Sequence, residues 1–205
     1  MIIYLVRHGE TAYNRDGLGL GRADAPLTDR GRLQVEAAAS RLAHLPLTRV
    51  FSSPLQRCLS AAEAITRDRD LVVTPEPALL ELDVGETEGL RFAEMRERYG
   101  DFLREWQSPE GHTVAMPGGE SIADLVARLR PFIEQLFVLD EPAIAVVSHN
   151  FVIRVLIAAL LGLEPSAFRA IGLDLASICT LERRGNGRVM IHSLNDHCHI
   201  LNLEH

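Results

Sequence analysis

The chain has 205 residues, and because about 150 residues is usual for one domain, one domain with an insertion is expected rather than two domains. Apolar residues make up 47% and charged residues 24%, a globular mixture that excludes a disordered chain, a collagen and a coiled coil. The formal net charge of −7 opposes general binding to nucleic acid or to an anionic membrane, so a bound anion must meet a local basic pocket.

The two ends of the chain and its cysteines bear on location and redox state. The run from Met1 to Val6 has no positive segment before it and breaks at Arg7, so it predicts a buried strand rather than a signal peptide. No apolar stretch approaches the ~20 residues that cross a bilayer, and the cytoplasm is the expected compartment. Residues 203–205 resemble the start of an expression tag. Neither a disulfide framework nor a zinc knuckle is expected from the unpaired spacing of Cys58, Cys179 and Cys198.

Six short β-rich runs alternate with helical patterns. They span residues 2–6, 49–51, 71–73, 143–147, 176–181 and 188–192. After the first run, Thr28 can cap a helix whose apolar face carries Leu33, Ala37 and Leu42. Crossover helices imply parallel strands, and a hairpin around Gly185-Asn186-Gly187 would make one strand antiparallel. The pattern predicts a three-layer α/β/α fold with a mixed, mostly parallel six-stranded sheet.

Three further segments complete this organisation. Ser53-Pro54 supplies an N-cap and a first-turn proline for the helix after the second strand. The stretch Ser121-Ile122-Ala123-Asp124 resembles a capping box. Residues 85–118 are polar, lack strand signal and contain the only Trp, so they are expected to form a small helical cap. Residues 1–202 are therefore interpreted as one domain that carries this cap insertion.

Basic residues follow three of the predicted strands. Arg7 and His8 come directly after the first, Arg57 lies in the first helical turns after the second, and His149 ends the fourth. Carboxyl ends of parallel strands meet at one edge of a sheet, where α/β proteins place ligands. Clustered like charges need an anionic partner, and phosphate fits because arginine grips its oxygens bidentately. An isolated His8 would more often be a structural histidine, but its basic neighbours favour a functional one; Arg7 and Arg57 have surface ion pairing as their alternative role.

Ordered motifs extend this observation over nearly the whole chain. They are Leu5-Val6-Arg7-His8-Gly9-Glu10-Thr11, Asn14, Pro26-Leu27-Thr28 with Gly31, Ser52-Ser53-Pro54-Leu55-Gln56-Arg57, Glu81, Gly85, Glu88-Gly89, Pro117-Gly118-Gly119-Glu120-Ser121 and Val147-Ser148-His149. With these motifs in this order, the chain resembles the histidine phosphatase superfamily, also called phosphoglycerate mutase-like. The resemblance runs from residue 3 to about residue 202.

The resemblance implies a phosphoryl-transfer pocket with His8 as the nucleophile. The Gly9 carbonyl would hold one ring nitrogen as N–H while the other attacks phosphorus. Glu81 would be the general acid and base, with Asp83 as the runner-up for that role. The remaining positions that match phosphate or substrate contacts of the family are Arg7, Asn14, Gly21, Arg22, Arg57 and His149.

Two positions depart from the family pattern. Asn150 stands where a glycine usually follows the second histidine, and it is expected to cap the next helix. Leu20 replaces the hydroxyl residue typical of mutases, which weakens a mutase assignment. The C-terminal run His197-Cys198-His199 could signal a metal site. Alternation along a strand would separate Cys198 from the two histidines, which opposes a shared site.

The sequence therefore predicts a phosphatase that hydrolyses a small phosphomonoester through a phosphohistidine on His8, without metal or cofactor. A cofactor-dependent phosphoglycerate mutase is the main alternative, and a non-catalytic phosphate-binding module is the second. No nucleic-acid or membrane partner is expected, and a homodimer is compatible with the sequence.

Overall fold

Six strands form one mixed sheet in the computed structural model, which describes residues 1–203. They are β1 (Ile2–Arg7), β2 (Arg49–Ser52), β3 (Val73–Pro75), β4 (Ala143–Ser148), β5 (Ile178–Arg183) and β6 (Val189–Asp196). Their order is β3-β2-β4-β1-β5-β6. Strands β1 to β4 pair in parallel, and β5 pairs antiparallel with both β1 and β6. The predicted six-stranded, mostly parallel sheet with one reversed strand is confirmed.

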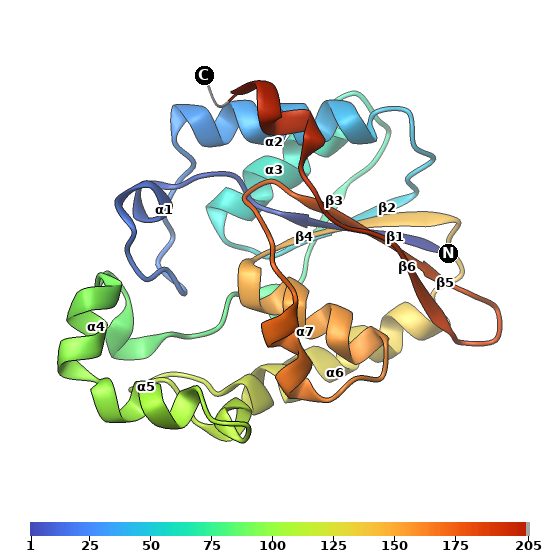
Figure 1. The fold of residues 1–205 in the computed structure, drawn as a ribbon. Helices are drawn as coiled ribbons and strands as arrows, with labels where there is room; N and C mark the ends of the chain where they lie inside the picture. Colours follow the sequence, from blue (N-terminus) through green and yellow to red (C-terminus); the bar gives the residue numbers. More distant parts are fainter. Residues whose placement is uncertain (204–205) are drawn as a thin grey trace.

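Helices cover both faces of this sheet and make three layers (Figure 1). One face carries α2 (Asp29–Leu42) and α3 (Gln56–Thr66), and the other carries α6 (Ile122–Val138) and α7 (Asn150–Leu160). The shorter helices are α1 (Ala12–Asp16), α4 (Phe92–Arg98) and α5 (Gly100–Trp106). The described part of the chain also has five short 3₁₀ turns, which are η1 (Pro77–Leu79), η2 (Gly85–Thr87), η3 (Gly111–Thr113), η4 (Pro165–Ala170) and η5 (Cys198–Leu203). No helix within residues 1–203 is long and apolar enough to cross a membrane.

The buried strands feed two hydrophobic cores, because successive side chains of a strand point to opposite faces. Along β4, Ile144 and Val146 pack into the core under α6 and α7. Ala143, Ala145 and Val147 of the same strand pack into the core under α2 and α3. All five side chains are at most 2% exposed. A strand buried on both faces has a continuous apolar sequence, which is why this run was recognisable as a strand.

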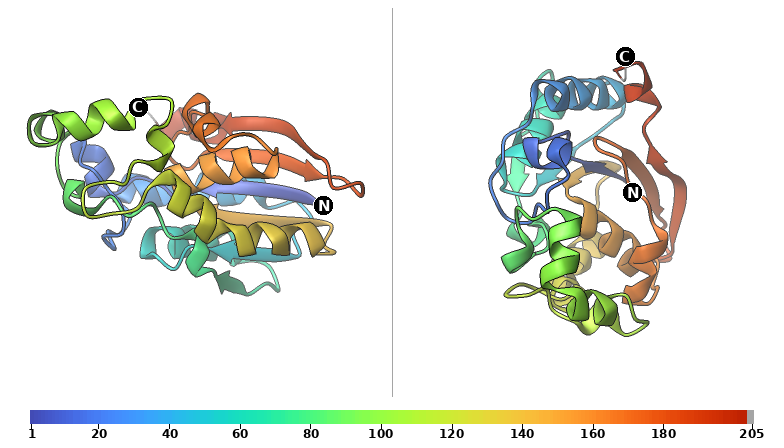
Figure 2. Two further views of the ribbon diagram at one scale, coloured as in Figure 1. Left: turned by 90° about the horizontal axis from the view of Figure 1, so that it is seen from below. Right: turned by 60° about the vertical axis from the view of Figure 1, so that its left-hand side comes forward.

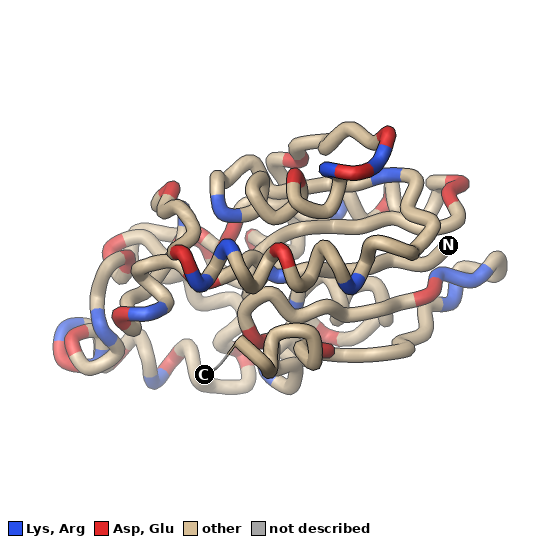
Figure 3. The backbone as a smooth tube through the Cα atoms, turned by 90° about the horizontal axis from the view of Figure 1, so that it is seen from above, with Lys and Arg blue, Asp and Glu red and all other residues tan. Residues whose placement is uncertain are grey.

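The segment 85–118 lies beyond the carboxyl ends of the parallel strands, on the same side as α1 (Figures 1 and 2). It contains α4 and α5, so its helical character is as predicted. Positive and negative residues alternate along it (Figure 3), as the interleaved Arg91, Glu94, Arg96 and Glu97 require. The mixed signs identify the outer surface of these helices as a solvated face.

Three local predictions were wrong. Helix α3 begins at Gln56, and its N-cap position is Leu55 rather than Ser53. The buried face of α2 carries Val35, Ala38 and Leu42, whereas Leu33 is 58% exposed. The C-terminal histidines do not continue β6, which ends at Asp196 before η5. Of the supposed tag, Leu203 lies in η5, and residues 204–205 lie outside the described residues.

The buried face of α2 can be tested with two identical substitutions on one helix. Leu42→Ala removes a side chain that is 1% exposed, so we expect the free energy of unfolding to fall by about 2–5 kcal/mol. Leu33→Ala is the matched control and should change it by less than about 0.5 kcal/mol. Urea unfolding followed by circular dichroism measures both. A larger loss for Leu33→Ala would reverse the assigned face.

Candidate active site

Three neighbouring strands deliver the predicted basic residues to one place. Strands β2, β4 and β1 are adjacent in the sheet, and Arg7 of β1 is in register with Ser148 of β4. The next backbone N–H, that of His8, donates to the Ser148 carbonyl at 3.1 Å. The rings of His8 and His149 consequently meet edge to face, with their centroids 5.2 Å apart.

His8 is held in one tautomer by its own neighbour. Its Nδ1 lies 2.7 Å from the carbonyl oxygen of Gly9, which can only accept a hydrogen bond. The proton therefore sits on Nδ1, and the lone pair sits on Nε2. Burial lowers the pKa of His8 well below its ordinary value, and the positive charges of Arg57 and Arg7 lower it further. His8 is accordingly an uncharged imidazole at neutral pH, with a free nucleophilic nitrogen.

His149 takes the opposite tautomer. The Nε–H of Arg57 donates to its Nδ1 at 3.3 Å, so the ring proton is on Nε2. That Nε2–H donates to the hydroxyl of Ser53 at 2.7 Å. Burial, followed by the charge of Arg57, lowers the pKa of His149 well below its usual range. The sequence reading assigned Ser53 to a helix cap and missed this contact, since nothing along the chain links the two residues.

Arg57 is the largest fully buried side chain of the described residues, with 0% of it exposed. Its Nη1 donates to the carbonyl of Ala23 and its Nη2 to that of Gly21, both at 2.7 Å. Together with the bond to His149, this uses three of its five N–H groups, and two remain for an anion. The 21–23 loop is itself fixed by Glu88, whose carboxylate accepts from the N–H groups of Gly21 and Ala23 at 2.8 Å.

Gly21 reaches this position because it has no side chain. A Cβ there would lie 2.8 Å from the side chain of Val84 and 2.9 Å from the carbonyl oxygen of Leu82. The close approach lets the Gly21 carbonyl point at Arg57. In this structure Gly21 therefore contributes by orienting Arg57.

Arg7 and Asn14 each present unused donors. Arg7 donates through Nη1 to the Leu173 carbonyl at 2.6 Å, and its buried Nε has no partner among residues 1–203. The Oδ1 of Asn14 accepts from the N–H and the hydroxyl of Thr11, at 3.1 and 2.9 Å, in the capping box of α1. Fixing this oxygen leaves the amide NH₂ of Asn14 as a donor with a set orientation.

Glu81 enters the same region from the loop between η1 and η2. It is 4% exposed, and its carboxylate accepts from the N–H of Leu82 at 2.9 Å and from that of Phe151 in α7 at 3.4 Å. Burial raises the pKa of Glu81, while the Leu82 bond and the charge of Arg57 oppose the rise. The net rise favours the protonated carboxylic acid, the form that a proton donor needs.

Arg22 lies in an ionic cluster beside this loop. It pairs with Glu120 at 2.7 Å and with Asp83 at 3.4 Å, and Arg128 pairs with Glu120 at 3.0 Å. The guanidinium groups of Arg22 and Arg128 also donate to the Glu81 carbonyl, at 3.4 and 3.3 Å. Here Arg22 acts on the backbone that carries Glu81, and Asp83 is engaged as its ionic partner.

The expectation for Asn150 was wrong. The N-cap of α7 is His149, Asn150 is the first helical residue, and no side chain caps this terminus. The side chain of His149 cannot cap the helix either, because its ring is hydrogen-bonded to Arg57 and Ser53.

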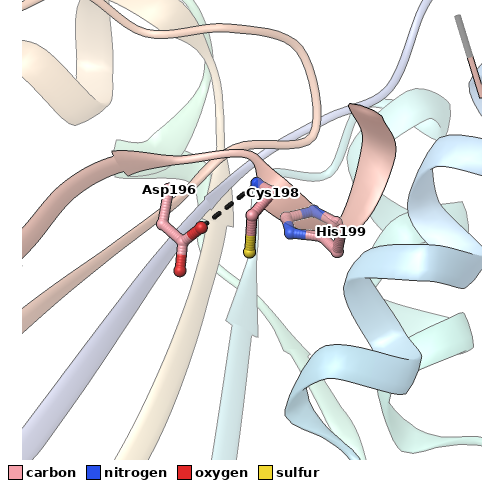
Figure 4. Close-up of side chains that lie close together, drawn as sticks. All are labelled: Asp196, Cys198 and His199. Carbon is pink, nitrogen blue, oxygen red and sulfur yellow. Dashed lines mark hydrogen bonds between the residues drawn. The ribbon is translucent and has the colours of Figure 1, made fainter. Parts of the chain in front are cut away.

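The C-terminal run forms a second group of metal-binding residue types. Because η5 turns the chain, Asp196, Cys198 and His199 approach one another with ligand atoms within 4.8 Å (Figure 4). The predicted separation by strand alternation is therefore wrong. Arg41 lies 3.8 Å from the Asp196 carboxylate, and its positive charge opposes a divalent cation there.

Comparison with known proteins identifies the family. The model of the histidine phosphatase superfamily (branch 1) matches residues 3–197. The chain belongs to this superfamily. It is 34% identical to phosphoserine phosphatase 1 of Hydrogenobacter thermophilus over 201 residues, which cover 97% of this chain and 93% of that one.

Two further relatives represent the two activities considered from the sequence, a phosphatase and a phosphoglycerate mutase. The alpha-ribazole phosphatase of Shigella flexneri superposes with a TM-score of 0.87 at 28% identity, over 96% of this chain and 97% of that one. The 2,3-bisphosphoglycerate-dependent phosphoglycerate mutase of Bartonella henselae is 32% identical over 171 residues, 79% of this chain and 82% of that one. The family predicted from the ordered motifs is confirmed.

The two tautomers can be observed directly. Long-range ¹H–¹⁵N spectra at pH 7 should show His8 protonated on Nδ1 and His149 on Nε2, because Gly9 accepts from one and Arg57 donates to the other. As pH falls, both rings should stay uncharged to well below the ~6.5 at which a solvated imidazole titrates. The denatured chain, in which both contacts are lost, is the control. A cationic ring at pH 7, or a His8 proton on Nε2, would contradict this electrostatic description.

Proposed function

We propose that the protein hydrolyses small phosphomonoesters through a covalent phosphohistidine on His8. The observation that carries the proposal is the Nδ1–H of His8 on the Gly9 carbonyl, which leaves an uncharged Nε2 beside two arginines. The chain's relatives include proteins named phosphoserine phosphatase and alpha-ribazole phosphatase, which supports phosphate ester hydrolysis as the reaction class.

The first step transfers the phosphoryl group to the protein. The Nε2 lone pair of His8 attacks phosphorus in line, and the bond from phosphorus to the ester oxygen breaks. The leaving oxygen takes the proton of Glu81, whose raised pKa keeps that proton available. In the second step the Glu81 carboxylate removes a proton from water, which attacks phosphorus while the bond from phosphorus to His8 Nε2 breaks. Inorganic phosphate leaves, and both residues return to their starting forms.

The remaining site residues hold the phosphoryl oxygens. Arg57 offers the two N–H groups that the protein does not use, Arg7 offers its unpartnered Nε–H, and Asn14 offers its amide. His149 orients Arg57 and can exchange its bond to Ser53 for one to phosphate. These donors are fixed before the substrate arrives, so they favour the charge that spreads over the oxygens in the transition state. Gly21 orients Arg57 through its carbonyl, and Arg22 holds the backbone carbonyl of Glu81.

Water is the proposed acceptor of the phosphoryl group. A mutase must hold a second, carboxylate-bearing substrate, which calls for basic residues free to bind it. In the cap, Arg104 is paired with Asp101 and Arg96 lies over the ring of Phe92, 5.2 Å from its centre. These two basic residues of the cap are therefore already engaged, which supports water as the acceptor.

The proposal also includes the domain organisation, the compartment and the kind of ligand expected from the sequence. Residues 1–202 act as one domain with the cap at 85–118, in the cytoplasm, on a small-molecule phosphate and without metal or cofactor. A homodimer is compatible with this reading.

The nucleophile is tested by trapping the intermediate. His8→Ala should abolish turnover, and rapid quench of the wild type with radiolabelled ester should place acid-labile, alkali-stable label on His8. A chelator should leave the rate unchanged.

Controls in the same experiment separate the alternatives. Label on Ser148 or Cys58 would refute the assignment. Phosphate release should far exceed transfer between positions 2 and 3 of phosphoglycerate, even with bisphosphoglycerate present to prime His8. Faster isomerisation than hydrolysis would establish the mutase instead.

The acid is tested with Glu81→Gln, which keeps the volume and removes the transferable proton. We expect turnover of alkyl phosphates to fall roughly 10²- to 10⁴-fold. Aryl phosphates, whose leaving groups need less protonation, should lose less in single-turnover phosphorylation. The acid must be protonated and its pKa is raised, so the wild-type rate should decline as pH rises through that pKa. The Gln variant should lack this decline.

Asp83→Asn is the matched control, since Asp83 is a neighbouring carboxylate engaged by Arg22 and the Gly85 N–H. A larger loss from Asp83→Asn, or equal losses for alkyl and aryl esters in Glu81→Gln, would move the acid role away from Glu81.

A further inference from the structure

An apolar cavity of about 210 Å³ lies between the cap and the first turn of α7. The side chains that define it most are Leu20, Val84, Met95, Phe102, Trp106 and Phe151. None of its lining residues is charged. Two lining residues have polar side chains, Thr87 and Gln107, and the Thr87 hydroxyl donates to the Val84 carbonyl at 2.7 Å. Because most of the lining is apolar, the cavity favours an apolar occupant over several waters, each of which needs two to four polar partners.

Three residues that line the cavity are also next to residues of the candidate active site. Phe151 lines it, and the N–H of the same residue donates to the Glu81 carboxylate at 3.4 Å. Leu20 lines it and directly precedes Gly21, whose carbonyl holds Arg57. Val84 lines it and abuts Gly21 from the other side. The cavity therefore adjoins the backbone segments that hold Glu81 and Arg57.

The inner part of this wall is preformed. The Trp106 ring packs edge to face on Phe151 and Phe168, with centroids 6.2 and 5.9 Å apart. Arg169 covers the Trp106 ring 4.4 Å from its centre and donates to its backbone carbonyl. Helix α4 supplies Met95 to the lining, and an unbranched thioether side chain adapts to ligands of different shape.

We infer that this cavity binds the alcohol portion of the substrate, and that the substrates are phosphate monoesters of apolar alcohols carrying an aromatic ring or a medium alkyl chain. The inference rests on the proposed function and adds the substrate class. An engineered apolar cavity of about 150 Å³ holds benzene, so a space of this size holds one aromatic ring with a short substituent. A charged alcohol such as serine would lose its hydration there without gaining an ionic partner.

A homologous series of substrates tests the inference without any mutation. Ethyl, butyl and hexyl phosphate have similar leaving groups, so the chemical step stays nearly constant along the series. Each methylene that enters the cavity should raise kcat/KM by up to roughly fourfold, the factor for burying one CH₂. O-phosphoserine should be a poorer substrate than hexyl phosphate. Equal kcat/KM along the series, or a preference for O-phosphoserine, would overturn the inference while leaving the hydrolytic function intact.

A binding measurement separates the cavity from the chemistry. Trp106 is the only Trp of the chain and lines the cavity, so its fluorescence reports occupancy. In His8→Ala, which should not turn over, hexyl phosphate should change this fluorescence saturably and at lower concentration than ethyl phosphate. Saturable binding together with no label on wild-type His8 would refute the proposed function but support the cavity. Identical titrations for the two esters would refute the cavity assignment.

Substitution in the lining provides the specific variant. Leu20→Ser should lower the hexyl-to-ethyl ratio of kcat/KM toward one, because it places a hydroxyl in the apolar wall. Leu163→Ser makes the same change at a side chain that is 50% exposed and outside the cavity, and should keep the wild-type ratio. A wild-type ratio in folded Leu20→Ser would overturn the inference.

Discussion

The active site depends on the burial of one charged side chain, that of Arg57. Removing a guanidinium from water costs several kcal/mol unless the protein replaces the lost hydrogen bonds. Here the replacement comes from the carbonyls of Gly21 and Ala23 and from the His149 ring. These partners belong to segments far apart in the sequence. Because each must be in place for Arg57 to be stable, the site is ordered before any ligand binds.

Burial also sets the protonation states that phosphoryl transfer needs. The same desolvation that lowers the pKa of His8 raises the pKa of Glu81, since in each case it disfavours the charged form. The arginines reinforce the first effect and oppose the second. The proposed nucleophile can therefore be neutral and the proposed acid protonated beside two cations, and a bound phosphate would supply the negative charge that the cluster lacks.

In the proposed function, residues at the sheet edge bind the phosphoryl group, and residues of the cap contact the alcohol. The proposed phosphate donors are side chains at strand ends and helix starts, and backbone carbonyls fix the two arginines among them. The side chains of α4 and α5 instead line the space where the alcohol would lie. A phosphate site separate from the wall that would meet the alcohol is compatible with the different substrates named for the relatives.

Much of this was determined by the sequence alone. The strands were recognisable because those buried on both faces are continuously apolar, and ordered motifs placed His8, Arg57, Glu81 and His149 in one family site. The buried face of helix α2 was not determined by the sequence: Leu33 was wrongly assigned to it, whereas it carries Val35, Ala38 and Leu42. A weakly amphipathic pattern does not specify the direction of contact with the sheet.

Only the tertiary structure decided what each polar side chain contacts. Ser53 and Asn150 are both cap-forming residue types, yet Ser53 accepts from His149, 96 positions away, and Asn150 does not cap α7. Arg22 pairs with Glu120 across 98 positions, and the cavity joins Leu20 to Phe151. Local sequence carries propensities over a few residues, whereas these contacts arise when distant segments pack and every buried donor must find an acceptor.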